Sequence, residues 1–459
     1  MGNFCCGADG CLKASNAKGT HKNKESNEKN EEKSIIDIEN NVNFQQDNEF
    51  NIPNRNNQLN IKESDSNNFK DNFEQNENTY LENEKILEKM AQELILKKNI
   101  LPKKYEPKDP IIVGLDNIDA PFYMNATLQC LSNSEDLTDY FLNKYEINPN
   151  KKLANKYNEV IINLWNKENN NKSYKPNSFK EVLSKLNPLF EGVNLIESKD
   201  LIKFLLDELH EELNVITNIY NINNDNEVDL DQTNESLVLK LFIDEFKQKF
   251  NSPISDLFFG IIELKSKCLS CNIITFNFKV YSLLDFPLEK VNKYFVNKGK
   301  KPLLTNDGRN PDIDLYECFE FYAKEELMSG ENQLYCNNCK QIANAYNSTT
   351  IFLSPIYLII NLNIGKENIY ECKVNFPEKL NLSNYVTFKK GFIEYDLYAV
   401  ICNLGPNSKD GHFVAYCRNR LDNKWYLYDD ANVTECSRKD QYNEGMPYIL
   451  FYKASSSSY

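Results

Sequence analysis

Residues 114–131 read GLDNIDAPFYMNATLQCL, and this stretch is the most informative part of the chain. Asp119 suits the N-cap of a helix and Pro121 suits its first turn, so we expect a helix to start here. Cys130 follows Phe122 by about 12 Å along the axis of such a helix, at 1.5 Å per residue. The stretch therefore predicts a helix with Phe122 at its beginning and Cys130 within its body.

Three further motifs follow in the C-terminal part of the chain: YDLYAV at 395–400, GHFVAY at 411–416 and WYLYDD at 425–430. Apolar and polar residues alternate in them, which predicts antiparallel strands. His412 lies in the second motif. The other two histidines are His21, in a tail expected to be disordered, and His210, in a helix-like LHEEL run where a solvated or capping role is expected.

Together these motifs resemble the cysteine and histidine boxes of the ubiquitin-specific proteases, papain-like thiol enzymes that cleave after the C-terminal glycine of ubiquitin. The family patterns are G-L-x-N-x-G-N-T-C-Y-M-N-S-x-L-Q-x-L and Y-x-L-x-A-V, G-H-Y-x-A-Y, W-Y-x-F-D-D. The resemblance covers about 111–452 and implies an α+β, papain-like cysteine protease fold with thumb, palm and zinc-bearing fingers. It also implies that His412 is the general base, Asp429 its orienting partner and Asn117 the oxyanion-hole side chain.

The family's nucleophilic cysteine falls on Phe122, whose phenyl ring cannot attack a carbonyl carbon. Residues 119–121 also differ from the family's Gly-Asn-Thr, and the Asp119 carboxylate would oppose a developing oxyanion. Three other thiols are candidates for a replacement nucleophile: Cys130, Cys402 and Cys417. We expect Cys130 to be a buried core thiol instead.

Residues 195–214 (LIESKDLIKFLLDELHEELN) resemble the family's Q-Q-D-A-x-E-F-L-x-x-L-L-D-x-L-H-E-E-L-N helix. Glu197 and Asp200 fall on the family's acidic pair, which meets arginines of the ubiquitin tail. Three residues apart, they share one helix face. The family's Gln-Gln pair is replaced by Leu195 and Ile196, and the alternative to ubiquitin contact is a solvated acidic face.

Two C-x-x-C pairs, Cys268/Cys271 and Cys336/Cys339, predict a closed structural zinc site with four thiolates. A redox C-x-x-C motif is the alternative. The resemblance places this zinc in the fingers. Between the pairs we expect a strand over 281–288 and a helix over 315–328, then two strands over 349–364. Segments 214–236 and 290–312 are expected to be inserted loops.

We expect a disordered Asn/Lys/Glu-rich tail over 1–78, an amphipathic helix and linker over 79–108, the protease-like domain over 109–453 and a flexible tail over 454–459. The start, Met-Gly-Asn-Phe-Cys-Cys, offers Gly2 for myristoylation and Cys5 and Cys6 for palmitoylation, against a tail with stray cysteines as the alternative.

The formal net charge is −14, which argues against nucleic-acid binding. No apolar run reaches the roughly 18 residues of a membrane span, and no secretory signal is evident, so a cytoplasmic protein is expected, membrane-associated if acylated. The residues favour a pseudo-deubiquitinase that binds ubiquitin or ubiquitinated partners without cleaving. The alternatives are an active thiol-dependent deubiquitinase and a membrane-tethered adaptor without ubiquitin binding.

Overall fold

The computed structural model describes residues 85, 89, 92, 111–118, 123–165, 173–191, 198–216, 232–365, 370–404, 412–437 and 445–455. Lys85, Lys89 and Gln92 have helical backbone, in agreement with a helix in the linker over 79–108. The expected disordered tail over 1–78, with Gly2, Cys5, Cys6 and His21, lies outside the described residues.

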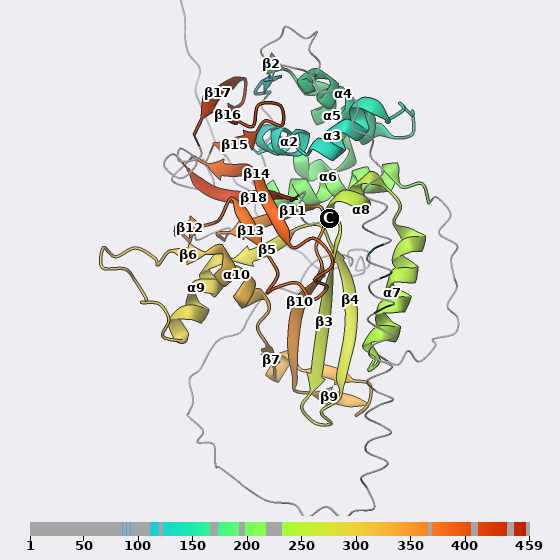
Figure 1. Cartoon of the computed structure of the whole chain (residues 1–459), viewed down its shortest axis with the longest axis vertical. Coiled ribbons are helices and arrows are strands. Elements are labelled where there is room, and N and C mark those ends of the chain that lie inside the picture. Colours follow the sequence, from blue (N-terminus) through green and yellow to red (C-terminus); the bar gives the residue numbers. More distant parts are fainter. Residues whose placement is uncertain are drawn as a thin grey trace, which may run out of the picture. The chain divides into compact units, whose positions relative to one another are not determined.

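Helices form one side of the domain (Figure 1). They are α2 (Met124–Ser132), α3 (Glu135–Asn143), α4 (Lys152–Trp165), α5 (Asn177–Leu186), α6 (Ser198–Leu213) and α8 (Pro253–Phe258). Every residue of α2 is buried, so this helix is the centre of the layer. On α6, Leu201, Leu205 and Leu209 recur every four residues and are fully buried, which makes one apolar face.

A large sheet packs against these helices. Its strand order is β17-β16-β15-β14-β18-β11-β5, with β13 also paired to β14. All neighbours are antiparallel except β11 and β5. The bounds are β5 Leu284–Pro287, β11 Tyr357–Asn363, β13 Lys379–Asn381, β14 Glu394–Asn403, β15 Phe413–Arg418, β16 Trp425–Asp429, β17 Asn432–Cys436 and β18 Met446–Ala454.

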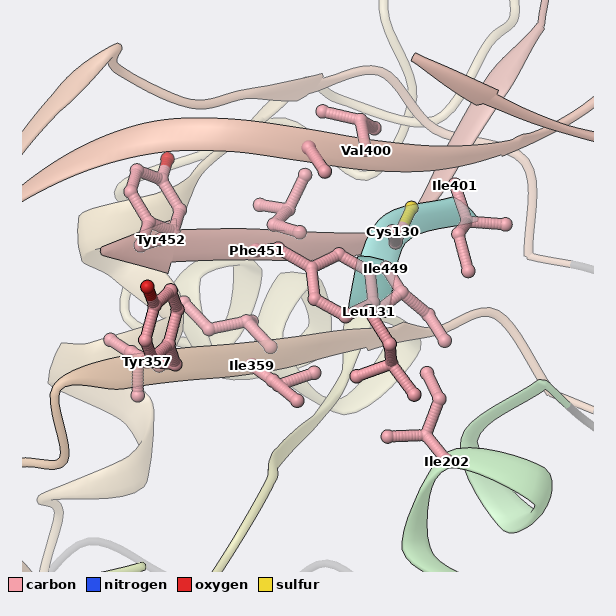
Figure 2. Close-up of a cluster of buried hydrophobic side chains, with 14 of the residues drawn as sticks. Cys130, Leu131, Ile202, Tyr357, Ile359, Val400, Ile401, Ile449, Phe451 and Tyr452 are labelled. Carbon is pink, nitrogen blue, oxygen red and sulfur yellow. The ribbon is translucent and has the colours of Figure 1, made fainter. Parts of the chain in front are cut away.

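The main hydrophobic core fills the space between this sheet and the helices. Figure 2 shows apolar side chains from β11, β14 and β18 meeting Cys130 and Leu131 of α2 and Ile202 of α6. The central strands β11, β14 and β18 are buried along nearly their whole length. This packing fixes α2 against β14 and β15, and so places the start of α2 beside the start of β15.

A second sheet, with order β4-β3-β10-β7, extends away from the first (Figure 1). Its strands are β3 (Gly260–Cys268), β4 (Ile274–Tyr281), β7 (Glu326–Met328) and β10 (Ala345–Leu353). Helix α7 (Glu235–Lys249) covers one face through a small core that includes Val238, Ile243 and Phe278. At the far end, β8 (Leu334–Cys336) and β9 (Gln341–Ala343) form a hairpin. The expected strands over 349–364 are confirmed as the end of β10 and β11.

The smaller elements include the helices α9 (Leu288–Asn297) and α10 (Leu315–Tyr322). They also include the strands β6 (Ile313–Asp314) and β12 (Val374–Asn375), which pair in parallel. Two short strands near the helices, β1 (Gly114–Leu115) and β2 (Ser173–Tyr174), also pair in parallel. The 3-10 turns Pro188–Phe190 and Gly330–Asn332 lie in connections. The strand expected over 281–288 is confirmed in its second half, as β5.

Three expectations about local structure were wrong. The segment 290–312 is not wholly a loop, because Leu288, Val291 and Phe295 share one buried face of α9. The helix expected over 315–328 ends at Tyr322, since Glu326–Met328 pairs with β10 as β7.

The third concerns His210, which is neither solvated nor a cap. It is buried between Phe250 and Phe259, with ring centroids 5.2 and 5.1 Å away. Its Nδ1 lies 2.7 Å from the hydroxyl of Ser252, the N-cap residue of α8. Burial lowers the pKa of His210, so the ring is a neutral part of the core.

Candidate functional site

His412 and Asp429 meet at one edge of the large sheet. His412 immediately precedes β15, and Asp429 is the last residue of β16, the antiparallel neighbour of β15. His412 Nε2 is hydrogen-bonded to Asp429 Oδ1. Both side chains are partly exposed, at 36% and 43%. The pairing leaves Nδ1 as the ring nitrogen that can take a proton from a reacting group, which is the geometry of a general base with an orienting carboxylate.

The next residue, Asp430, ties residues 114–125 to this edge. Its Oδ2 accepts from Asn117 Nδ2 at 3.0 Å, and its Oδ1 accepts from Asn125 Nδ2 at 2.8 Å. Its backbone carbonyl accepts from the Leu115 N–H at 2.9 Å. Asp430 thus holds Asn117, the residue matched to the oxyanion hole, beside the His412–Asp429 pair.

Gly114 allows the backbone of β1 to lie close to the backbone of residues 430–431. A Cβ built on it would lie 2.4 Å from the Ala431 carbonyl oxygen, so only glycine allows the two backbones to approach. The sequence reasoning missed Asp430 and Asn125. The signals were present in the Asp-Asp pair of WYLYDD and in the match of Asn125 to an asparagine of the quoted family pattern.

The candidate nucleophile position, Phe122, lies outside the described residues, as do Asp119 and Pro121. The helix starts later than expected, because Tyr123 is the N-cap residue and α2 begins at Met124. The Tyr123 ring packs edge-on against Phe413, with centroids 6.4 Å apart. Phe413 directly follows His412, so the residue after position 122 is in contact with the residue after the candidate base.

The first turn of α6 reaches the same region. Burial and the nearby Asp200 carboxylate both raise the pKa of Tyr123. The Asp200 carboxylate, in the first turn of α6, is thus near enough to Tyr123 to act on its hydroxyl electrostatically. The neighbouring Lys199 bridges to Asp285 of β5, with Nζ and Oδ2 3.1 Å apart. Glu197, Leu195 and Ile196 lie outside the described residues.

The thiols considered as replacement nucleophiles are in the wrong environment. Cys130, Cys402 and Cys417 are all fully buried. Burial raises the pKa of Cys130 and of Cys402, which suppresses the reactive thiolate. The Cys417 and Cys130 sulfurs lie 3.9 Å apart inside the core. These thiols belong to the packing between α2, β14 and β15, and the expectation of Cys130 as a core thiol is confirmed.

The two C-x-x-C pairs converge at the far end of the second sheet. Cys268 Sγ is 3.8 Å from Cys339 Sγ, and Cys271 Sγ is 3.7 Å from Cys336 Sγ. All four sulfurs lie within 4.8 Å of one another. Four thiolates on a zinc ion at about 2.3 Å would be about 3.8 Å apart at the corners of a tetrahedron. The donor set and the spacing both fit a closed metal site with four cysteine ligands.

The two pairs also share one backbone geometry. The N–H of Asn272 donates to the Cys268 carbonyl at 2.9 Å, and the N–H of Lys340 donates to the Cys336 carbonyl at 2.8 Å. Both Asn272 and Lys340 have positive φ, 59° and 53°. A hydrogen bond from the Ile273 backbone lowers the pKa of the Cys271 thiol to about 6. This backbone hydrogen bond favours the thiolate form of Cys271, which is the form that binds metal.

The family model "Ubiquitin carboxyl-terminal hydrolase" matches residues 113–452. The chain belongs to the ubiquitin-specific protease family. It is 27% identical over 358 residues to ubiquitin carboxyl-terminal hydrolase 2 of Homo sapiens, covering 75% of this chain and 55% of the relative. It is also 27% identical over 370 residues to ubiquitin carboxyl-terminal hydrolase 21 of Homo sapiens, covering 74% and 61%. The chain thus spans a little over half the length of these relatives.

The α+β fold expected from the resemblance is therefore confirmed. In this member of the ubiquitin-specific protease family, the second sheet carries the four-cysteine group, while His412, Asp429 and Asp430 lie at the edge of the large sheet. No helix within the described part of the chain is long and apolar enough to cross a membrane.

Proposed function

We propose that this chain is a pseudo-deubiquitinase, a ubiquitin-specific protease fold that binds ubiquitin or ubiquitinated proteins without hydrolysing them. One observation carries the proposal: in the sequence, Phe122 falls on the nucleophile position of the family pattern, while the His412–Asp429 pair is assembled. A base without a nucleophile cannot start the acyl-enzyme route, and only weak noncovalent rate enhancement remains.

The remaining site residues keep the roles that the family pattern gives them. His412 would act as general base if a thiol were restored, and Asp429 would hold its tautomer. Asn117 would donate to the oxyanion, because its amide is already oriented by Asp430. The burial of Cys130, Cys402 and Cys417 supports the view that no other thiol of the core has taken over.

Ubiquitin recognition is proposed for the acidic start of α6. The Asp200 carboxylate acts electrostatically on Tyr123 at the start of α2, and a peptide tail would have to end there to reach position 122. Glu197, which falls on the family's acidic pair together with Asp200, would add a second carboxylate. A pair of carboxylates complements a basic tail and would select it electrostatically.

The four-cysteine group is proposed to hold structural zinc through Cys268, Cys271, Cys336 and Cys339. Bound zinc would supply folding free energy to the end of the second sheet and take no part in chemistry. This region is otherwise poor in apolar packing, because Leu269, Tyr335 and Ile342 are exposed there.

We also propose that the chain is cytoplasmic and attached to a membrane by acylation of Gly2, Cys5 and Cys6. A myristoyl group alone gives marginal binding, and palmitoylation of one cysteine would make it stable. Mass spectrometry of the chain purified from its own cells would detect the acyl groups, and an unmodified N-terminus would contradict this part of the proposal.

The deciding experiment is turnover of a fluorogenic ubiquitin C-terminal conjugate by the full chain, with wild type and Phe122→Cys measured together. We expect a silent wild type and an active Phe122→Cys variant that loses activity when His412→Ala is added. Wild-type turnover that thiol alkylation abolishes would refute the pseudo-enzyme and point to an active deubiquitinase.

A titration with mono-ubiquitin separates the remaining alternative. Saturable binding by wild type, weakened by Asp200→Lys, supports ubiquitin recognition. Lys203→Glu on the same helix is the matched charge control. If wild type does not bind ubiquitin, the adaptor hypothesis replaces the proposal.

A further inference from the structure

The connection between α9 and β6 presents an adjacent pair of exposed leucines. Leu303 is 74% exposed and Leu304 is 51% exposed. Figure 1 shows this connection extending away from its neighbouring elements. We infer that this loop, residues 298–304 (KGKKPLL), is a membrane-contact element that inserts its two leucines into an anionic lipid surface.

The exposure of the leucines is built into the loop. Just after them, the Thr305 N–H donates to the Arg309 carbonyl at 2.8 Å, and the Arg309 N–H donates to Thr305 Oγ1 at 3.1 Å. The preceding Lys301 is anchored to Glu317 of α10. The Asn310 side chain donates to the Glu371 carbonyl at 2.8 Å. An apolar tip held in place this way loses little conformational entropy on binding.

Lysines surround the tip. The heptapeptide 298–304 contains three lysines and no acidic residue, in a chain of net charge −14. Lys298 Nζ lies 4.2 Å from the centroid of the Tyr294 ring, and Lys300 Nζ lies 5.1 Å from that of Phe295. Both ammonium groups therefore rest on aromatic rings of α9, next to the tip, and a lysine with its stem on apolar surface can turn its charged head to a lipid headgroup.

The acidic groups that face these lysines differ in exposure: Glu317, which holds Lys301, is only 23% exposed, whereas Glu320 is 43% exposed. Lys300 pairs with Glu320 at 3.1 Å, with both side chains about half exposed, and such pairs exchange readily for other anions. Arg309 pairs with Asp307, which is also exposed. Salt screens the negative charge elsewhere in the chain beyond about 10 Å. Repulsion from an anionic membrane would therefore orient the molecule with its tip toward the lipid and would not prevent contact there.

The size of the feature favours lipid over protein. A stable protein interface takes roughly 20–30 residues on each side, whereas this tip offers two leucines on a narrow loop. Insertion into a lipid surface needs only apolar side chains that reach the acyl boundary and cations at headgroup level. The inference rests neither on ubiquitin binding nor on acylation.

The test uses the full chain produced without an acyltransferase, so that no lipid is attached. Its sedimentation with vesicles of 70% phosphatidylcholine and 30% phosphatidylserine is compared with sedimentation on pure phosphatidylcholine. We expect binding to the anionic vesicles that falls at least about tenfold in Leu303→Ser/Leu304→Ser and falls in Lys298→Glu/Lys300→Glu. Leu189→Ser, at a position 63% exposed elsewhere in the chain, should leave binding unchanged.

A second readout reports insertion directly. Tryptophan emission of Leu303→Trp should shift to the blue when anionic vesicles are added. Wild type that does not sediment with anionic vesicles, or a double serine variant that sediments as wild type does, overturns the inference. So does a double serine variant that loses a protein partner while keeping vesicle binding.

Discussion

Replacing Asp430 tests whether the contact between residues 114–125 and the β16–β17 turn holds the site together. The Asp430 carboxylate accepts the Asn125 amide at 2.8 Å in a partly buried position and the Asn117 amide at 3.0 Å in an exposed one. The buried bond to a charged acceptor is worth about 1.5–3 kcal/mol, and the exposed one about 0.5 kcal/mol. Asn125 keeps weaker contacts with the Leu115 and Asp116 carbonyls at 3.3 Å.

The backbone adds a further contribution. Asp430 has a φ of 49°, a conformation that asparagine and aspartate tolerate better than alanine by about 1 kcal/mol. Asp430→Ala should therefore lower the free energy of unfolding by about 3–4 kcal/mol. Asp430→Asn keeps the backbone preference and one acceptor oxygen, but its NH2 group would face the amide donor of one of the two asparagines. The free energy of unfolding should therefore fall by about 1–2 kcal/mol.

The assay is urea unfolding of the full chain, followed by circular dichroism. Glu435→Ala is the matched control, since Glu435 pairs only at the surface with Lys424 and its loss should cost less than about 0.5 kcal/mol. In a Phe122→Cys background, Asp430→Ala should also lower turnover of the ubiquitin conjugate, by up to the roughly 10²–10³ that an oxyanion donor contributes. Equal stability of the Asp430→Ala and Glu435→Ala variants would refute the reasoning.

Three further outcomes are expected. The free energy of unfolding should fall as the pH drops below about 6.5, because burial lowers the pKa of His210 in the folded chain and the unfolded chain takes up the proton first. Urea unfolding at about pH 7 and about pH 5 should show a smaller loss of stability in His210→Gln than in wild type. An equal loss would exclude His210 as the cause. Metal analysis should find one zinc ion per chain in wild type and in Cys372→Ser, and none in Cys271→Ser. Full zinc occupancy in Cys271→Ser would contradict the four-cysteine site. Lys453→Met should cost about 1–2 kcal/mol, because it removes the cation that bridges the partly exposed carboxylates of Glu135 and Asp136, at 2.6 and 3.2 Å. Urea unfolding is the measurement, and a loss no larger than that of Glu435→Ala would show that solvent already screens these carboxylates.

Much of the site could be predicted from the sequence because its chemistry is local. The GHFVAY and WYLYDD motifs each place one functional side chain at a strand end, and the pairing of those strands then brings His412 to Asp429. The C-x-x-C pairs were equally predictable, since their spacing already fits one half of a tetrahedral site each. The second aspartate of WYLYDD marks Asp430 as a candidate, but only the folded contact shows that it accepts the Asn117 and Asn125 amides, because these partners lie far away along the chain.

The sequence pattern predicted the wrong structure for α9 and for β7, because tertiary packing decides both elements. The residues of α9 looked like part of a Lys-containing loop, but Leu288, Val291 and Phe295 have a core to face in the folded domain. Glu326–Met328 had the composition of a helix end, but the open edge of β10 offered backbone partners that a helix could not supply.

The sequence by itself determined the family, the absence of a thiol at position 122 and the four sulfurs that could hold a metal ion, because each depends on which atoms the side chains carry. Only the tertiary structure decided that His210 is a neutral core residue, that Cys130, Cys402 and Cys417 are shielded from reaction, and that Leu303 and Leu304 are exposed. Burial and exposure depend on what other segments cover a residue, and segments far apart in the chain are brought together only when the whole domain packs.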